Sequence, residues 1–282
     1  MTLNEEHNIE YCLRSVRSWC TEVIVADMYS EDRTQEIAKR YVDKFISIDR
    51  VEGFDAGRRK AFDNATGDWI LSIDADEIIT PKLADWIMDY VGKDPEIDLI
   101  RILRANVFLG RWVRSSPWWP GKPRLFRPDA IEVTGQLHHG LMPRPGIRIA
   151  DVPRDPDLSM WHFTFQSIAG MVDKSNRYTS IEARQAIEAG NDKVRVTSLF
   201  IEPLKIFGVY LMRRGWRDGL AGLAWTFDRM YYRFLSLIKR WDERQVPTRQ
   251  NEYDKMREEI LAGFPAAGRR EGESSQVPDA AS

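Results

Sequence analysis

The sequence has few cysteines, few histidines and no long hydrophobic run. Its 282 residues include two cysteines, Cys12 and Cys20, and four histidines. If the segment between the cysteines is helical, about 12 Å of rise separates them, which is too far for a disulfide. No segment approaches the roughly 18 uncharged apolar residues of a membrane span, and no export signal opens the chain. We therefore expect a cytoplasmic protein in a reducing compartment.

The chain also lacks an excess of charge of either sign. Its formal net charge is −2 and its pI is about 6.2, so the total charge gives no reason to expect nucleic acid as a partner. Hydrophobic residues make up 43% of the sequence, which is enough for the core of one large α/β domain or of a domain with a helical appendage.

Strand-like and helix-like segments alternate through the first third of the chain. Each strand-like run is apolar and β-branched, and each following segment has helical periodicity. The pairs are 21–27 with 31–42, 45–48 with 55–65, and 68–74 with the segment after Pro81. This alternation predicts a mostly parallel sheet covered by helices on both faces.

The rest of the chain changes character twice. Residues 98–163 contain short strand-like runs separated by Pro, Gly and Trp, as in a substrate-binding insertion. Helical patterns then cover 165–188, 197–213 and 217–242. The polar, Pro/Gly/Ser-rich tail from residue 264 is expected to be disordered.

Two carboxylates stand at the end of the third strand-like run. The sequence SIDADE places Asp74 and Asp76 two residues apart after an apolar segment. Hard oxygen ligands at a strand terminus suit Mg²⁺ or Mn²⁺ bound to a diphosphate. A solvated acidic turn is the plain alternative for an isolated D-x-D motif.

Several segments carry a resemblance to a known family. In chain order they read TLNEEHNIEYCLRSV, EVIVAD with SEDRTQEIA, and GFDAGRRKAFDNATGDWILSIDADE. They resemble the consecutive nucleotide-sugar-binding segments of family 2 glycosyltransferases. The later segments RANVFLGRWV, KPRLFRP, LHHGL, MWHF and KSNRYTSIEA are similar to a subgroup that includes lipopolysaccharide-core β-glucosyltransferases. The similarity runs from residue 1 to about 240.

The resemblance implies an α/β fold of the GT-A, Rossmann-like type, with a mixed sheet and a C-terminal helical extension. No apolar strand precedes Asn4 and Glu5, so we expect the sheet to lack its first strand and the native chain to begin further upstream. The expected organisation is a catalytic domain over 1–163, a helical region over 164–245 and a disordered tail over 264–282.

Donor and metal residues follow from the same resemblance. Asp74 would contact ribose and the metal, Asp76 would ligate the metal directly, and His162 matches a C-terminal histidine placed against the metal. An alternative for His162 is a packed core residue. The residues implied along the nucleotide and its phosphates are Thr2, Leu3, Asn4, Glu5, Asp27 and Arg58. For Asp27 the alternative is a turn before a helix.

The catalytic base is implied less directly. In the related subgroup an acid follows the histidine of the LHHGL segment, whereas this chain has His139 there. A histidine can act as general base near neutral pH. His139 is therefore the expected base and His138 a contact to the diphosphate or sugar, with Asp129 and Glu132 as substitutes. Trp118 and Trp119 could stack on an acceptor sugar or fill the core of the insertion.

Residues 193–244 combine positive charge with aromatic side chains. This segment has 11 Lys or Arg against 5 Asp or Glu, although the whole chain is slightly acidic. Such a composition fits helices lying on an anionic membrane surface. A helical pair packed on the catalytic domain with a basic outer face is the alternative.

The expected reaction is an inverting, metal-dependent transfer of a hexose with Mn²⁺ or Mg²⁺. The resemblance indicates glucose from UDP-glucose as the donor sugar and a lipopolysaccharide or other lipid-linked glycan at the inner face of the membrane as acceptor. Two alternatives remain open: transfer to a peptide or another glycan, and a catalytically inactive nucleotide-sugar-binding protein, which the missing strand and His139 would suit.

Overall fold

A computed structural model describes residues 1–50, 54–93, 96–116, 121–134, 140–191 and 193–262. Within the chain, residues 1–241 and 242–282 form two compact units. The tail predicted to be disordered from residue 264 lies outside the described residues.

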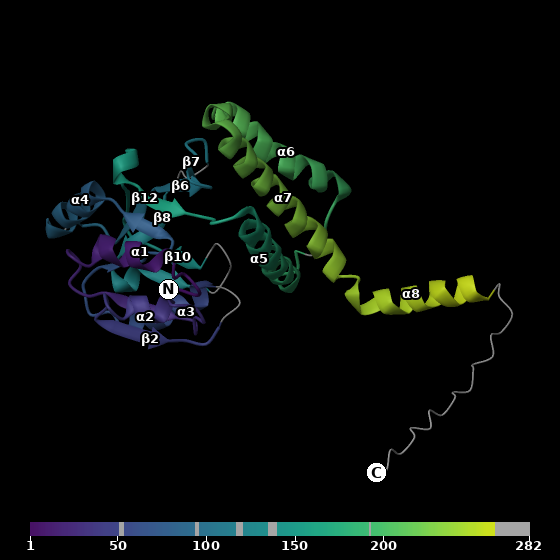
Figure 1. The fold of residues 1–282 in the computed structure, drawn as a ribbon, viewed down its shortest axis with the longest axis horizontal. Helices are drawn as coiled ribbons and strands as arrows, with labels where there is room; N and C mark the ends of the chain where they lie inside the picture. Colours follow the sequence, from purple (N-terminus) through teal and green to yellow (C-terminus); the bar gives the residue numbers. More distant parts are fainter. Residues whose placement is uncertain (51–53, 94–95, 117–120, 135–139, 192, 263–282) are drawn as a thin grey trace, which may run out of the picture. The chain divides into compact units, whose positions relative to one another are not determined.

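The first third of the chain alternates strands and helices as the sequence predicts (Figure 1). Its elements are α1 (Ile9–Val16), β1 (Ile24–Asp27), α2 (Thr34–Ala38), β2 (Lys44–Ser47), α3 (Phe54–Asp63), β3 (Ile70–Leu71), β4 (Glu77–Ile79) and α4 (Pro81–Gly92). Helix α4 begins where Thr80 accepts a hydrogen bond from the Leu83 backbone N–H at 3.2 Å and Pro81 fills the first turn. Helix α1 turns Ile9, Leu13 and Val16 into the core.

Short strands joined mostly by turns occupy the middle of the chain. They are β5 (Leu99–Ile102), β6 (Arg104–Phe108), β7 (Arg111–Trp112), β8 (Lys122–Phe126), β9 (Ile131–Val133), β10 (Leu141–Pro143), β11 (Ile149–Asp151) and β12 (Met160–Phe163). Two single-turn 3₁₀ helices interrupt them, η1 (Pro128–Ala130) and η2 (Pro156–Leu158).

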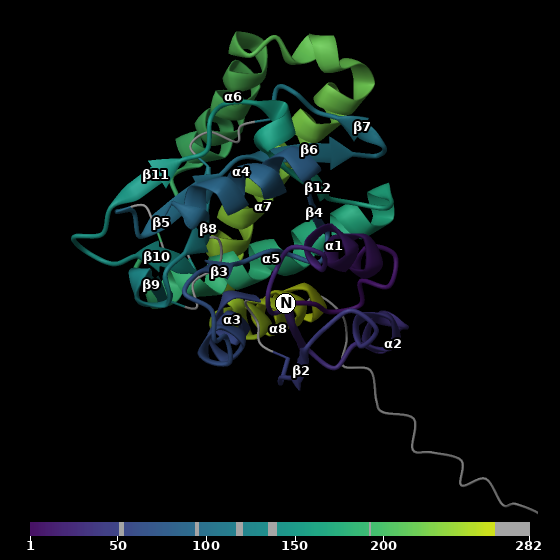
Figure 2. The same cartoon turned by 90° about the vertical axis from the view of Figure 1, so that its left-hand side faces the viewer.

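The strands form two four-stranded sheets and two pairs. The sheets have the orders β11-β5-β8-β3 and β4-β12-β6-β7, and the pairs are β1-β2 and β10-β9. Figure 2 shows β5 and β8 side by side, and they run antiparallel. The mixed sheet is confirmed, and the expectation of a mostly parallel one is wrong. Strand β8 runs against both β5 and β3, because short turns rather than crossover helices connect the strands after residue 98.

Strand β1 is bonded on both edges. Its residues pair with β2 in parallel, from Ile24 opposite Lys44 to Asp27 opposite Ser47. On the other edge Thr2 forms an isolated parallel bridge, donating its N–H to Ala26 O and accepting the Met28 N–H, both at 3.0 Å. The segment that follows Thr2 is thereby placed at the carboxyl end of β1, where ligands of α/β sheets bind.

Helices make up the last part of the chain. They are α5 (Ile168–Glu188), α6 (Val196–Met212), the 3₁₀ turn η3 (Gly215–Asp218), α7 (Gly219–Glu243) and α8 (Val246–Leu261). The first three long helices match the predicted segments, whereas α8 was not foreseen. Phe108 of β6 joins this region to the sheets, since its ring lies edge-on to Phe165 and Trp225 at 5.9 and 5.5 Å. Among the described residues, no helix combines the length and apolarity needed to cross a membrane.

Candidate functional site

An acidic turn joins β3 to β4 at the carboxyl end of β3. Backbone hydrogen bonds fix it from three sides: Ser72 N–H to Arg124 O at 2.7 Å, Glu77 N–H to Asp74 O at 3.0 Å, and Phe163 N–H to Asp76 O at 2.8 Å. The two carboxylates predicted as the functional pair therefore sit on a rigid turn, one pointing to each side.

Asp74 lies among three arginines. Arg58 of α3 pairs with its Oδ1, while Arg124 of β8 and Arg104 of β6 reach its Oδ2 at 3.0 and 3.2 Å. Burial alone would raise the pKa of Asp74, but Arg58, Arg124 and Arg104 outweigh it and hold the pKa well below its usual range. Both carboxylate oxygens are thus engaged by guanidinium groups.

Glu77 is the second acid of this cluster and is fully buried. It pairs with Arg104 and with Arg124, the latter at 2.7 Å, and accepts the Asp74 backbone N–H at 2.9 Å. Three arginines thus face two carboxylates. Lys122 also borders the cleft, and desolvation there, followed by the charges of Arg104 and Arg124, lowers the pKa of its ammonium group to about 8. The floor of the site is electropositive and suited to an anion.

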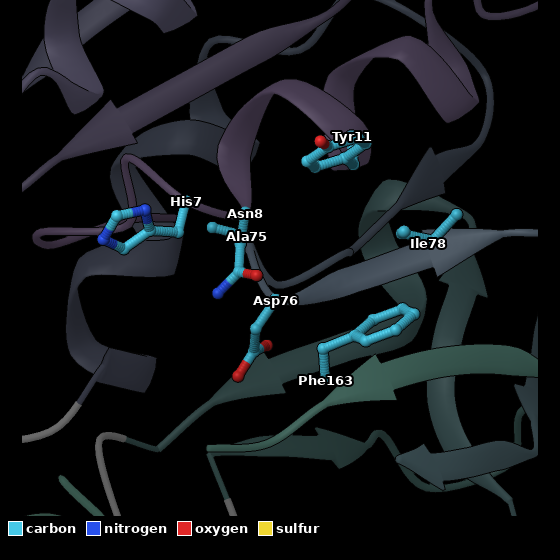
Figure 3. Close-up of a pocket in the computed structure, with 7 residues that line it drawn as sticks. All are labelled: His7, Asn8, Tyr11, Ala75, Asp76, Ile78 and Phe163. Atoms are coloured by element: carbon cyan, nitrogen blue, oxygen red, sulfur yellow. The ribbon is translucent and has the colours of Figure 1, made fainter. Parts of the chain in front are cut away.

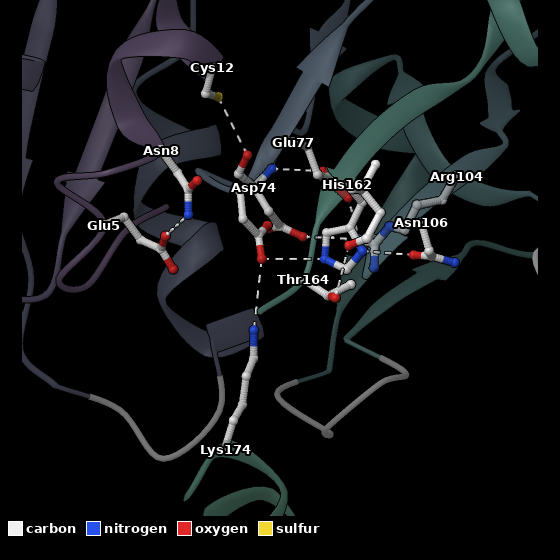
Figure 4. Close-up of polar contacts among 12 residues, drawn as sticks. Glu5, Asn8, Cys12, Asp74, Glu77, Arg104, Asn106, His162, Thr164 and Lys174 are labelled. Atoms are coloured by element: carbon white, nitrogen blue, oxygen red, sulfur yellow. Dashed lines mark hydrogen bonds and ion pairs between the residues drawn. The ribbon is translucent and has the colours of Figure 1, made fainter. Parts of the chain in front are cut away.

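Asp76 faces a histidine held in a defined orientation. Asn106 Nδ2 donates to Ser116 Oγ at 3.0 Å, which turns Asn106 Oδ1 toward His162 Nδ1, 2.8 Å away (Figure 4). A proton on Nδ1 satisfies this hydrogen bond, and the other ring nitrogen, Nε2, lies 3.3 Å from Asp76 Oδ2.

This arrangement fits a bound cation. Burial, and then Arg104, lower the pKa of His162, so its ring favours the neutral form and Nε2 is an acceptor. In this tautomer Nε2 and Asp76 Oδ2 are two acceptor atoms 3.3 Å apart, which either a proton on Nε2 or a cation between them satisfies. Ligand distances of about 2.0–2.1 Å for Mg²⁺ allow both atoms to bind one ion. The hydrogen bond to Asn106 is the outer support usual for a metal-bound histidine.

The protein supplies only part of such an ion's coordination. Within the described ranges, no three His, Cys, Asp or Glu side chains gather into one ligand set. Two protein ligands with substrate phosphates and water are a common arrangement for Mg²⁺. Burial would raise the pKa of Asp76, but positive charge at His162 and then at Lys174 lowers it to about 2; a cation bound at Nε2 would take the place of the charge on the ring.

A cleft of about 700 Å³ opens over this cluster. Its walls include Gly140 and Leu141 from the middle of the chain, Lys174 and Tyr178 from α5, and further residues of α7. The helical region therefore forms part of the site. Glu5 also borders the cleft, and burial, followed by the charge of Asp76, raises its pKa to about 7.

A smaller hollow of about 250 Å³ lies on the α1 side of Asp76 (Figure 3). His7, Tyr11 and Phe163 line it together with Asn8, Ala75 and Ile78. Asp76 borders both spaces, so a ligand in the cleft and one in the hollow would meet at the same carboxylate.

Some of the predicted site residues line the cleft in the structure, and others do not. Those that line the cleft are Thr2, Glu5, Arg58, Asp74, Asp76 and His162. Leu3, Asn4 and Asp27 do not line it. Asp27 is buried and accepts the Ser30 backbone N–H at 2.9 Å and its hydroxyl at 2.5 Å, as in a turn before a helix. His138, His139, Trp118 and Trp119 lie outside the described residues.

Three cationic residues of the site were not predicted. Arg104, Arg124 and Lys174 all fall in segments that carry the family resemblance, but none was assigned a role. A signal was present for Arg124, because an arginine within the apolar run KPRLF of a strand is rarely buried without a partner.

An α/β sheet with an acidic turn at a strand's carboxyl end, beside a histidine and a cationic cleft, defines a glycosyltransferase of the GT-A fold. The profile of glycosyl transferase family 2 matches residues 1–144, and the chain belongs to this family.

The sequences of related glycosyltransferases are similar to most of this chain. It is 24% identical over 259 residues to the lipopolysaccharide core biosynthesis glycosyltransferase LpsC of Rhizobium meliloti, covering 89% of this chain and 94% of that protein. An uncharacterized glycosyltransferase of Rickettsia felis is 28% identical over 255 residues, covering 85% and 87%. The solved structure of S. aureus TarS 1–349 covers 89% of this chain and 90% of its own, with 14% identity and a TM-score of 0.44, values too low for comparing sites.

Proposed function

We propose that this glycosyltransferase transfers a hexose, glucose from UDP-glucose, with inversion onto a lipopolysaccharide or other lipid-linked glycan. The observation that carries the proposal is the pair of acceptor atoms on Asp76 and His162, facing each other beside a cationic cleft. A divalent cation and a diphosphate are the two partners that satisfy both features. We take residues 1–163 as the catalytic domain and 164–245 as the helical region that completes the cleft.

Asp76 and His162 would hold Mn²⁺ or Mg²⁺, which when bound neutralises charge on a departing diphosphate. Lys174 reaches from α5 to within 3.7 Å of Asp76 Oδ2 and can move to a phosphate oxygen when one is present. Lys122 gives the cleft a second ammonium group. Together these residues bind and orient the leaving group.

Asp74 and Arg58 would position the nucleoside rather than the ion. Arg58 donates to Ser72 Oγ at 3.0 Å and pairs with Asp74, which fixes the carboxylate toward a ribose. Thr2 and Glu5 border the same end of the cleft. We keep Leu3, Asn4 and Asp27 as proposed nucleoside contacts, and Asp27 would first have to exchange its hydrogen bonds to Ser30.

The acceptor hydroxyl requires a base on the face opposite the diphosphate. His139 is the proposed base and His138 a proposed sugar contact, because their neighbours Gly140 and Leu141 border the cleft. Trp118 and Trp119 are proposed to stack on the acceptor sugar. The name of the Rhizobium relative supports a lipopolysaccharide acceptor, which would bring the enzyme to the inner face of the membrane.

The test is a donor screen with purified protein. UDP-glucose is compared with other UDP-hexoses, each with Mn²⁺, with Mg²⁺ and with chelator, while UDP release is recorded with and without lipopolysaccharide core acceptor. The expected result is metal-dependent UDP release that acceptor accelerates, with glucose recovered on the lipid-linked product. Sugar found on peptide instead would reassign the acceptor, and donor binding without UDP release would identify an inactive nucleotide-sugar-binding protein.

A further inference from the structure

Helix α6 exposes apolar side chains where a surface helix normally exposes polar ones. Eight of its residues are exposed: Val196, Thr197, Phe200, Ile201, Leu204, Lys205, Leu211 and Met212. Six of the eight are apolar and none is acidic. Phe200 is 65% and Met212 76% exposed, so these are not edges of a buried core.

The apolar surface continues past the end of α6. Trp216 in η3, and Leu220 and Phe227 in α7, are exposed, with Leu220 at 81%. The α6–η3–α7 segment, residues 196–234, is called the hairpin here. Glu202 of α6 lies 3.8 Å from Arg233 of α7, which ties its two helices together. Exposed apolar side chains gathered on one helical pair are typical of an interaction site.

Cations gather at the tip of the hairpin. Arg213, Arg214 and Arg217 are all exposed within five residues. The one acid among them, Asp218, is turned inward and accepts the Ser115 backbone N–H at 2.8 Å. The tip therefore presents positive charge beside Trp216, an aromatic residue that favours a boundary between water and an apolar phase.

Helix α7 connects this surface to the cleft. Trp225, Arg229 and Tyr232 border the cleft from one face of the helix, while Leu220 and Phe227 are exposed on another. An α-helix with its side chains is about 10–12 Å across. A partner covering the hairpin would therefore lie about one helix diameter from the cleft.

We propose that the hairpin docks on a lipid bilayer that contains anionic headgroups, with its apolar side chains in the interface and its tip arginines on phosphates. The proposal deepens the proposed function, on which it rests for the lipid-linked acceptor. A second copy of the chain fits less well, because a two-fold interface over the tip would bring like-charged arginines together.

The test is sedimentation of the full chain with phosphatidylcholine vesicles, with and without phosphatidylglycerol. Binding is expected to the anionic vesicles and to fall as salt shortens the Debye length from about 10 Å at 0.1 M to about 3 Å at 1 M. Arg214→Gln with Arg217→Gln should lower partitioning about 30-fold, at about 1 kcal/mol per charge. The matched control, Arg33→Gln with Arg40→Gln at exposed positions that flank α2, should change it little.

A second variant tests the apolar part. Phe200→Ser with Leu204→Ser should weaken vesicle binding at least tenfold, whereas Met88→Ser, which alters an exposed methionine of α4, should not. Equal binding of all variants, or binding indifferent to headgroup charge, would overturn the proposal, as would self-association without vesicle binding. UDP-glucose affinity, measured by calorimetry without lipid, reports the proposed function separately: donor binding without docking sinks only this inference.

Discussion

The acidic cluster and the hairpin break the usual rule of burial in opposite directions. Arg58, Arg124, Asp74 and Glu77 place four charged groups in or beside the sheet core, with Glu77 fully buried. The hairpin instead leaves Phe200, Leu204 and other apolar side chains in water. Charged groups are seldom buried and apolar surface is seldom gathered outside, so both regions differ from ordinary structure.

The two regions differ in what offsets their unfavourable contacts: the desolvation of buried charges in one, and the exposure of apolar side chains to water in the other. The buried charges pair with one another, so their desolvation is offset inside the chain. The apolar side chains of the hairpin stay exposed among the residues that the structure describes, and the proposed membrane surface would cover them. An internal network of this kind stabilises the site, whereas an external face defines what the protein attaches to.

The largest expected effect comes from breaking the internal network. Arg124→Met removes a partner from Glu77 and leaves a buried carboxylate undercompensated, so unfolding free energy should fall by about 3–5 kcal/mol. Denaturant unfolding measures it. Arg101→Met is the control, because the Arg101–Asp151 pair is about one-third exposed and should be worth about 0–1 kcal/mol. Equal losses in both variants would mean that burial does not distinguish the pairs.

Asp76→Asn should separate function from stability within the same region. Glycosyl transfer should fall roughly 10³-fold, because a metal ion contributes several kcal/mol to the barrier, while thermal unfolding changes little. Activity assays with Mn²⁺ and calorimetric cation titration check both parts. Asp89→Asn on exposed α4 serves as the matched control. Wild-type turnover in a folded Asp76→Asn protein would remove Asp76 from the proposed metal site.

His139→Gln should have a smaller effect, lowering turnover roughly 10²-fold with donor affinity unchanged. A histidine base is active when deprotonated, so wild-type activity should rise with pH through about 6.5 and the variant should lose this limb. A pH–rate profile of the wild type and the variant measures it. Full activity would redirect the search to Asp129, Glu132 or His138.

The smallest effect on stability is expected at the hairpin. Phe200→Ser with Leu204→Ser should change unfolding free energy by no more than about 0.5 kcal/mol per site, because neither side chain is buried. Leu83→Ala in the core should cost about 2–5 kcal/mol. If the hairpin substitutions are as costly as Leu83→Ala, the apolar face is covered within the protein and the contrast between the two regions fails.

Much of the secondary structure could be predicted from local sequence. The alternation of strands and helices, the start of α4 at Pro81 and the three long helices could be predicted, because periodicity and capping act within one segment. The antiparallel pairing of β8 could not, since it depends on which distant strands meet. The short turn closed by Asp27 could also be anticipated from the sequence, because an aspartate side chain commonly accepts a hydrogen bond from a backbone N–H a few residues ahead.

The same distinction applies to the site. Asp74, Asp76 and Arg58 stand in one continuous motif and could be proposed from it, whereas Arg104 and Arg124 become partners of Asp74 only because β6 and β8 converge on the acidic turn. His162 was predicted as a metal ligand only through the family resemblance. Its orientation by Asn106, 56 residues earlier, required the pairing of β12 with β6.

The hydrogen bond between Asn106 and Ser116 has a consequence for how the enzyme responds to its surroundings. Ser116 O also accepts from Arg213 at 3.3 Å, and Ser115 is held by Asp218, so the tip of the hairpin anchors the segment that orients His162. Given the proposed cation site and the proposed docking, cation affinity and attachment of the tip would be linked: if docking orders this segment and tightens the cation, the cation must strengthen docking by the same factor. A membrane carrying the acceptor would in that way act as an activator, and free enzyme in solution would hold its cation more weakly.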